Sequence, residues 1–137
     1  MATNLREVIR SGLAAWSRGD LEGVLDTLDP DCEFTPSGAF PGLERSYRGH
    51  DGYRRFWRDF RGAWEDISIE IERIIEAESS VFVVVARFRA RGRDGLTVER
   101  PTNLVFTGGE VAIKRIAVFG SWEAAFEAAG LPPAAGA

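Results

Sequence analysis

The feature that most constrains this chain of 137 residues is a change in hydrophobic period near residue 65. Before this point, apolar residues recur every three or four positions, which is the spacing of amphipathic helices. After it, they alternate with polar residues, as in Ile67-Ser68-Ile69-Glu70-Ile71, which is typical of half-buried strands. Helices followed by consecutive strands predict an α+β domain in which helices cover an antiparallel sheet.

Caps and chain breakers give the expected boundaries. Asn4 and Asp20 are typical N-caps, and Gly19 and Asp29-Pro30 are typical helix stops. The expected helices cover residues 5–18, 21–28, 50–64 and 122–129, and the expected strands cover 31–35, 65–76, 81–91, 97–107 and 111–119. Residues 1–131 are therefore expected to form one domain, and 132–137 a flexible tail.

Composition and charge argue against several classes of protein. A formal charge of −4 and a pI near 5.1 disfavour nucleic acid as a partner, because phosphate binding needs a basic face. The single cysteine and the single histidine form no metal-ligand spacing. No apolar run approaches the roughly 20 residues that cross a bilayer, and residues 1–12 do not resemble a signal peptide. We expect a cytoplasmic protein without metal, cofactor or membrane partner.

Tight turns between the later strands would fix which side chains face one another. They predict Glu70 opposite Arg87 and Arg89 opposite Glu99, so that the arginines on the outer face form a salt-bridged surface. The same outer face begins with an apolar strip, consisting of Val81, Val83 and Val85. An exposed strip of this kind predicts a homodimer through the sheet.

The same register gives the inner face a different character. It places Phe88 opposite Arg100 and the small Ala86 opposite Thr102, so two polar groups and some free space occur on an apolar surface. An aromatic helical stripe is expected to cross this face beside Trp16 of the first helix: Tyr53, Phe56, Trp57, Phe60 and Trp64. This combination is typical of a small-molecule pocket. A filled core with Arg100 reaching the rim would give the same pattern.

Three side chains are weak catalytic candidates. Glu33 is either a desolvated base or an ion-paired surface residue, because its neighbours Cys32 and Phe34 also look buried. His50 is the only imidazole, but its place at a helix start favours a surface role. Arg100 is the third candidate. Cys32 has no basic neighbour in the sequence to activate its thiol.

Four motifs in order resemble the SnoaL-like branch of the nuclear transport factor 2-like superfamily. They are Ala14-Ala15-Trp16-Ser17-Arg18-Gly19-Asp20-Leu21-Glu22, Leu28-Asp29-Pro30-Asp31-Cys32-Glu33-Phe34, Tyr47-Arg48-Gly49-His50-Asp51-Gly52 and Glu127-Ala128-Ala129-Gly130-Leu131. The resemblance covers residues 5–131. It implies a cone-shaped fold with three helices on a curved, mostly antiparallel sheet, a short C-terminal helix, a deep pocket and frequent homodimers. It does not imply one activity, since members include isomerases, cyclases, hydrolases and binding domains.

At the positions where the family has its usual catalytic groups, this chain has other residues. At the positions of the base and the two oxyanion donors of ketosteroid isomerases, this chain has Thr35, Gly12 and Thr102. The stretch that matches the acid/base Asp of the cyclases is Phe119-Gly120-Ser121-Trp122, which has no carboxylate. A histidine common in the next-to-last strand corresponds to Leu104.

We therefore expect a domain that binds a small, largely apolar metabolite. The expected ligand-contacting residues are Trp16, Thr35, Trp57, Phe60, Phe88, Arg100 and Thr102. Two alternatives stay open. One is an enzyme (a cyclase, isomerase or hydrolase) that uses Glu33 as base and Arg100 as electrostatic stabiliser. The other is a protein-interaction or structural domain with a filled core. The sequence does not decide whether the chain is an enzyme.

Overall fold

The structure, a computed structural model, describes residues 4–36, 42–78, 80–109 and 112–132. Its elements in chain order are α1 (Leu5–Ser17), α2 (Leu21–Leu25), β1 (Leu28–Thr35), β2 (Tyr47–Arg48), α3 (Gly49–Phe56), the π-helical turn η1 (Trp57–Arg61), β3 (Trp64–Glu78), β4 (Val81–Gly92), β5 (Thr97–Gly108), β6 (Ile113–Phe119) and α4 (Trp122–Ala129). The predicted α+β class is confirmed. Most of the predicted tail, residues 133–137, lies outside the described residues.

The predicted N-caps begin the first two helices. The Asn4 side chain accepts a hydrogen bond from the Glu7 N–H at 3.4 Å, and Asp20 accepts one from the Gly23 N–H at 2.9 Å. Helix α2 is shorter than predicted and ends at Leu25. The reason is that the Thr27 carbonyl accepts a hydrogen bond from the Ile113 N–H at 2.9 Å, so the chain joins the sheet there.

The third helix also ends earlier than predicted. After α3 the chain widens into η1, and Trp64 already belongs to β3. A side chain at Gly62 would place its Cβ 2.7 Å from the Arg58 carbonyl oxygen. The turn after η1 is therefore tight enough to require a glycine, and Trp64 begins the sheet instead of ending the helical stripe.

The six strands form one sheet in the order β2-β1-β6-β5-β4-β3. Neighbouring strands are antiparallel, except that β1 runs parallel to β6. The predicted registers are confirmed, with Glu70 opposite Arg87 and Phe88 opposite Arg100. The inner face of the sheet therefore carries the residues that alternation predicted.

The outer face carries the predicted ion pairs. Arg87 and Arg89 contact Glu99 at 2.9 Å and 3.4 Å. The hydrogen bond from Arg87 is the main cause that lowers the pKa of Glu99. All three side chains are exposed, so the pairs contribute little stability each and make this surface polar.

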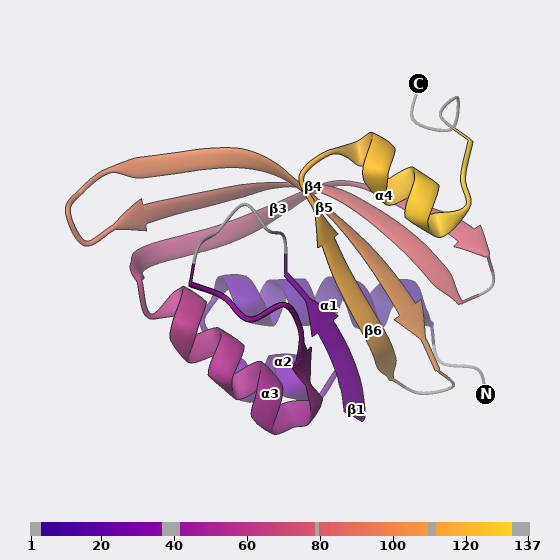
Figure 1. Cartoon of the computed structure of the whole chain (residues 1–137), viewed down its shortest axis with the longest axis horizontal. Helices are drawn as coiled ribbons and strands as arrows, with labels where there is room; N and C mark the ends of the chain where they lie inside the picture. The colour runs from indigo at the N-terminus through magenta and orange to yellow at the C-terminus, as the bar shows by residue number, and fades with distance from the viewer. Residues whose placement is uncertain (1–3, 37–41, 79, 110–111, 133–137) are drawn as a thin grey trace.

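Helices cover both faces of the sheet. Figure 1 shows α1, α2 and α3 on one face and α4 on the opposite face. The main core lies between the first three helices and the sheet, and a second cluster lies under α4.

The prediction of an exposed valine strip is wrong, because Val83 has no exposed surface and Val81 and Val85 pack in the cluster with Phe126. The strip therefore gives no reason for a homodimer.

One polar side chain is buried under α4. Asn103 of β5 is 2% exposed, and its Oδ1 has no hydrogen-bond partner among the residues that the structure describes. We expect Asn103→Leu to raise the free energy of unfolding by about 1–3 kcal/mol, because leucine has the same branched skeleton without the unsatisfied polar group. Urea denaturation measures this change, with Asn103→Ala as the control that removes the amide but leaves a cavity. A leucine variant less stable than the wild type would contradict the prediction.

Candidate functional site

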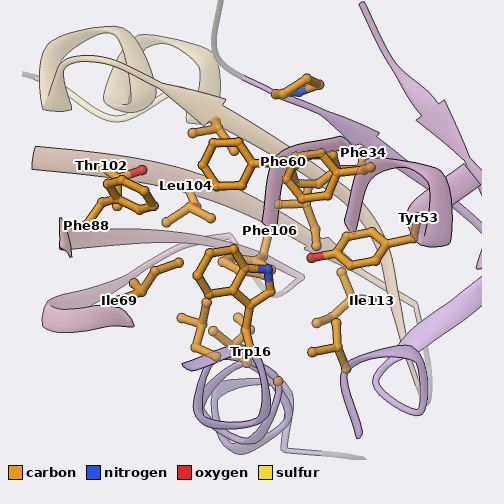
Figure 2. A pocket seen from close by; sticks show the side chains of 18 of the residues that line it. Trp16, Phe34, Tyr53, Phe60, Ile69, Phe88, Thr102, Leu104, Phe106 and Ile113 are labelled. Atoms are coloured by element: carbon orange, nitrogen blue, oxygen red, sulfur yellow. The ribbon is translucent and has the colours of Figure 1, made fainter. Parts of the chain in front are cut away.

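A cavity of about 300 Å³ lies between the helices and the inner face of the sheet. This volume is at the lower end of the range for small-molecule pockets. Figure 2 shows its wall, which is formed mainly by apolar side chains from α1, β1, η1 and strands β3 to β6. Trp16 comes from α1, Phe60 from η1, Phe88 from β4 and Leu104 from β5. The aromatic residues thus enclose a space that they do not fill.

Few polar side chains reach this wall, and they differ in burial. Thr27 and Tyr53 are buried, whereas Thr102 is half-buried and Arg100 is exposed. The Thr27 hydroxyl already donates to the Val24 carbonyl oxygen at 2.6 Å. The inner part of the cavity is therefore neutral, and the cation lies at the rim.

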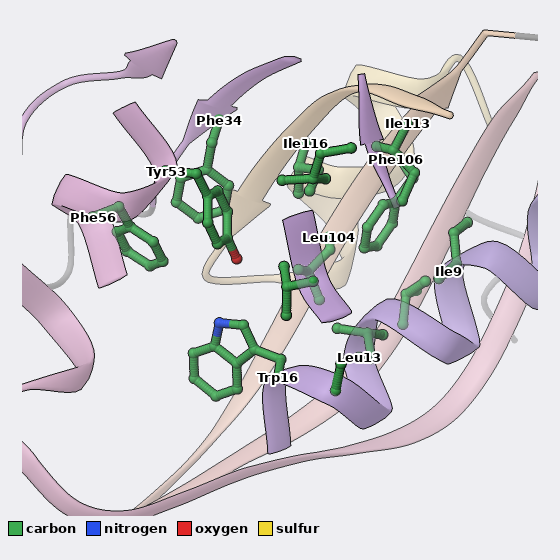
Figure 3. Packing of buried hydrophobic residues seen from close by; sticks show 14 of the residues in the cluster. Ile9, Leu13, Trp16, Phe34, Tyr53, Phe56, Leu104, Phe106, Ile113 and Ile116 are labelled. Carbon is green, nitrogen blue, oxygen red and sulfur yellow. The ribbon is translucent and has the colours of Figure 1, made fainter. Parts of the chain in front are cut away.

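Tyr53 is the polar group that sequence reasoning missed. Its place on the aromatic stripe was predicted, but it was not among the expected ligand-contacting residues. Its hydroxyl points into the cavity, toward the indole nitrogen of Trp16 (Figure 3). Burial is the main cause that raises the pKa of Tyr53, and the hydrogen bond from Trp16 opposes this shift. The phenol is therefore neutral at pH 7.

Arg61 holds Trp16 from the other side. Its guanidinium donates to the Trp16 carbonyl oxygen at 2.8 Å and lies over the rings of Trp16 and Trp57, at 5.2 Å and 4.9 Å from their centroids. Burial lowers the pKa of Arg61. Arg61 is therefore half-buried against the two indoles, whereas Arg58 of the same turn is exposed.

The structure places most of the expected ligand-contacting residues on the cavity wall: Trp16, Phe60, Phe88, Arg100 and Thr102. Trp57 lies outside the wall and contacts Trp16 edge-on, with 6.1 Å between ring centroids. Thr35 also lies outside it, because it points to the opposite side of β1 from Phe34, which faces the cavity.

The structure does not bring the three catalytic candidates together. Glu33 lies outside the cavity and faces Arg115, with 3.9 Å between the charged groups. The His50 Nε2 is 2.9 Å from the Leu28 carbonyl oxygen, so the ring connects α3 to β1. Arg100 alone contributes to the wall. The orientation that the sequence left open for Glu33 is thus outward and ion-paired.

Other reactive groups are also in structural settings. Burial, followed by the charges of Asp29 and Glu33, raises the pKa of the Cys32 thiol to about 12, so the reactive thiolate is not formed at neutral pH. Within the described part of the chain, no cluster of His, Cys, Asp and Glu side chains is suited to a metal ion. No helix in the same residues is long and apolar enough to cross a membrane.

The fold and its cavity define a class of protein. Helices on one face of a curved sheet, enclosing an apolar cavity, are the architecture of nuclear transport factor 2-like proteins. The model of the SnoaL-like domain family matches residues 9–123 of this chain. The chain belongs to the SnoaL-like domain family.

Solved structures of this fold are similar over most of their length. TerC co-crystallised with polyporic acid has a TM-score of 0.79 at 20% identity, covering 93% of this chain and 99% of its own. A Mycobacterium tuberculosis protein in complex with estradiol-17beta-hemisuccinate has 0.74 at 13%, covering 87% and 95%. A Delta 5-3-ketosteroid isomerase from a Mycobacterium species has 0.74 at 14%, covering 88% and 95%. A comparison with curated proteins finds no match. At these identities the likeness shows a shared fold.

Proposed function

We propose that this chain binds a small, largely apolar molecule in the cavity between the helices and the sheet. One observation carries the proposal: a cavity of about 300 Å³ whose wall is apolar and aromatic, with a few polar groups. Such walls gain binding energy from buried apolar area and use polar groups for orientation. The polyporic acid and estradiol complexes of proteins with this fold support the same class of ligand.

The same wall favours binding over the two alternatives. A structural domain with a filled core would leave no cavity of this size. An enzyme that uses Glu33 as base would need that carboxylate in the cavity, and it faces Arg115 instead. No carboxylate or imidazole occurs among the described wall residues, so the usual general bases are missing there.

Calorimetric titration with 2-acetylnaphthalene tests the proposal. We expect saturable binding of one molecule per chain, with a negative heat-capacity change, because apolar surface leaves water. Heats that never saturate, or no heat and no thermal stabilisation, would contradict it.

Arg100 is the residue that we expect to recognise a polar or anionic end of the ligand at the rim. We expect Arg100→Met to weaken binding of 2-naphthylacetate about tenfold. The lost hydrogen bond between charged groups is exposed to water, so its free energy is at the low end of the usual range. Binding of the uncharged 2-acetylnaphthalene and the free energy of unfolding should change little, because methionine keeps the apolar stem.

Arg58→Met is the matched control, because Arg58 is exposed on η1 outside the cavity. It should leave both affinities unchanged. Equal losses for the two probes in Arg100→Met would mean that Arg100 supports the fold rather than the ligand.

The homodimer stays a prediction that now rests on the family resemblance alone. The outer face that α4 leaves uncovered carries the ion pairs of Glu99, not the apolar strip on which the prediction was based.

A further inference from the structure

The Tyr53 hydroxyl is an unusual group to find in this cavity. Tyr53 is 5% exposed and belongs to the apolar core cluster. Burying a hydroxyl without a full set of partners costs free energy, whereas phenylalanine would fill the same place without that cost. The phenol is therefore expected to have a use that the ring alone does not provide.

Trp16 determines whether the Tyr53 hydroxyl is available to a ligand as a hydrogen-bond donor or as an acceptor. The Tyr53 hydroxyl faces the Trp16 indole nitrogen, and an indole N–H is only a donor, so it can satisfy a lone pair of the phenol oxygen but cannot accept the phenol O–H. None of the hydrogen bonds among the described residues is donated by the Tyr53 hydroxyl. Because Arg61 binds the Trp16 carbonyl and covers its ring, the indole is fixed on one side of the hydroxyl.

The Tyr53 O–H is thus a neutral hydrogen-bond donor in apolar surroundings. Burial raises the pKa of Tyr53, so the proton is retained at neutral pH. A carboxylate at this depth would be costly, since the cation of the described wall, Arg100, is exposed at the rim. A neutral oxygen acceptor, such as the carbonyl of a ketone or quinone, can accept a hydrogen bond from this O–H without bringing a charge into the core.

From this geometry, and resting on the proposed function, we propose that the cavity selects aromatic or polycyclic carbonyl compounds. The ligand presents its carbonyl oxygen to the Tyr53 hydroxyl, and its rings lie against the aromatic wall formed by Trp16, Phe60 and Phe88. Tyr53 is thus a specificity-determining residue, and Trp16 positions it.

Two probes of the same shape test this selection. 2-Acetylnaphthalene carries a carbonyl, and 2-isopropylnaphthalene replaces the oxygen by a methyl group. The measured quantity is the ratio of their affinities, compared between the wild type and Tyr53→Phe by calorimetry. We expect the variant to lower the preference for the ketone about five- to tenfold, as for a lost hydrogen bond whose acceptor stays buried.

Tyr47→Phe is the matched control. Tyr47 is also a buried tyrosine, but its hydroxyl lies outside the cavity, 3.2 Å from Asp59 and 3.0 Å from the Glu44 N–H. It should leave the ratio unchanged. An unchanged ratio in Tyr53→Phe, with both probes still bound, would overturn the inference and leave the proposed function intact. Failure of the wild type to bind either probe would overturn the proposed function.

A spectroscopic measurement on the wild type covers the case in which Tyr53→Phe does not fold. A hydrogen bond weakens the C=O bond of the ketone, so we expect the infrared carbonyl stretch of bound 2-acetylnaphthalene at lower frequency than in hexane. A stretch at the hexane position would overturn the inference.

Discussion

Replacing Phe126 by alanine is expected to lower the free energy of unfolding by about 3–5 kcal/mol. Phe126 is 1% exposed and is the large apolar side chain by which α4 covers Val83 and Val105. Its removal leaves a cavity in a small cluster that has few other apolar contacts to compensate. Urea denaturation followed by circular dichroism measures the loss.

The control for this change is Glu127→Ala, the neighbouring exposed residue of the same helix. It should change the free energy of unfolding by less than about 0.5 kcal/mol. A loss below about 1 kcal/mol for Phe126→Ala would mean that α4 does not cover the sheet in solution. The valine strip would then be available for a homodimer after all.

Val118→Trp is expected to abolish binding in the cavity, with a loss of affinity of about 100-fold or more. Val118 lines the cavity from β6 and lies opposite Leu104 of β5, so an indole at this position projects into the empty volume. A ligand can then no longer bury its apolar area there. The free energy of unfolding should fall by at most about 1–3 kcal/mol, the range for added core volume.

Arg115→Trp places the same ring on the outer side of β6, where Arg115 is 65% exposed. It should bind 2-acetylnaphthalene as the wild type does. Equal affinity of Val118→Trp and the wild type would show that the probe binds elsewhere on the protein.

The sheet could be predicted well because its information is local. Strict alternation and short turns leave one register that pairs apolar with apolar and charge with opposite charge, and the pairs of Phe88 and Glu70 follow from it. That register also placed Phe88, Arg100 and Thr102 on the inner face, where they line the cavity.

Features that depend on how distant elements meet could not be predicted. The sequence of α4 predicts an amphipathic helix, but not that it lies on the outer face over Val83. The face of Glu33 was decided by the pairing of β1 with β6, which brings Arg115 beside it. The partnership of Tyr53 and Trp16 joins α3 to α1, and no spacing in the sequence indicates it.

The crystal structure of the protein with 2-acetylnaphthalene tests the central proposal most directly. We expect one naphthalene ring inside the cavity, in contact with Trp16, Tyr53 and Phe88, in protein whose fold is otherwise unchanged. Side chains that close over the cavity and leave the probe outside would contradict the proposal that this chain binds a small apolar molecule.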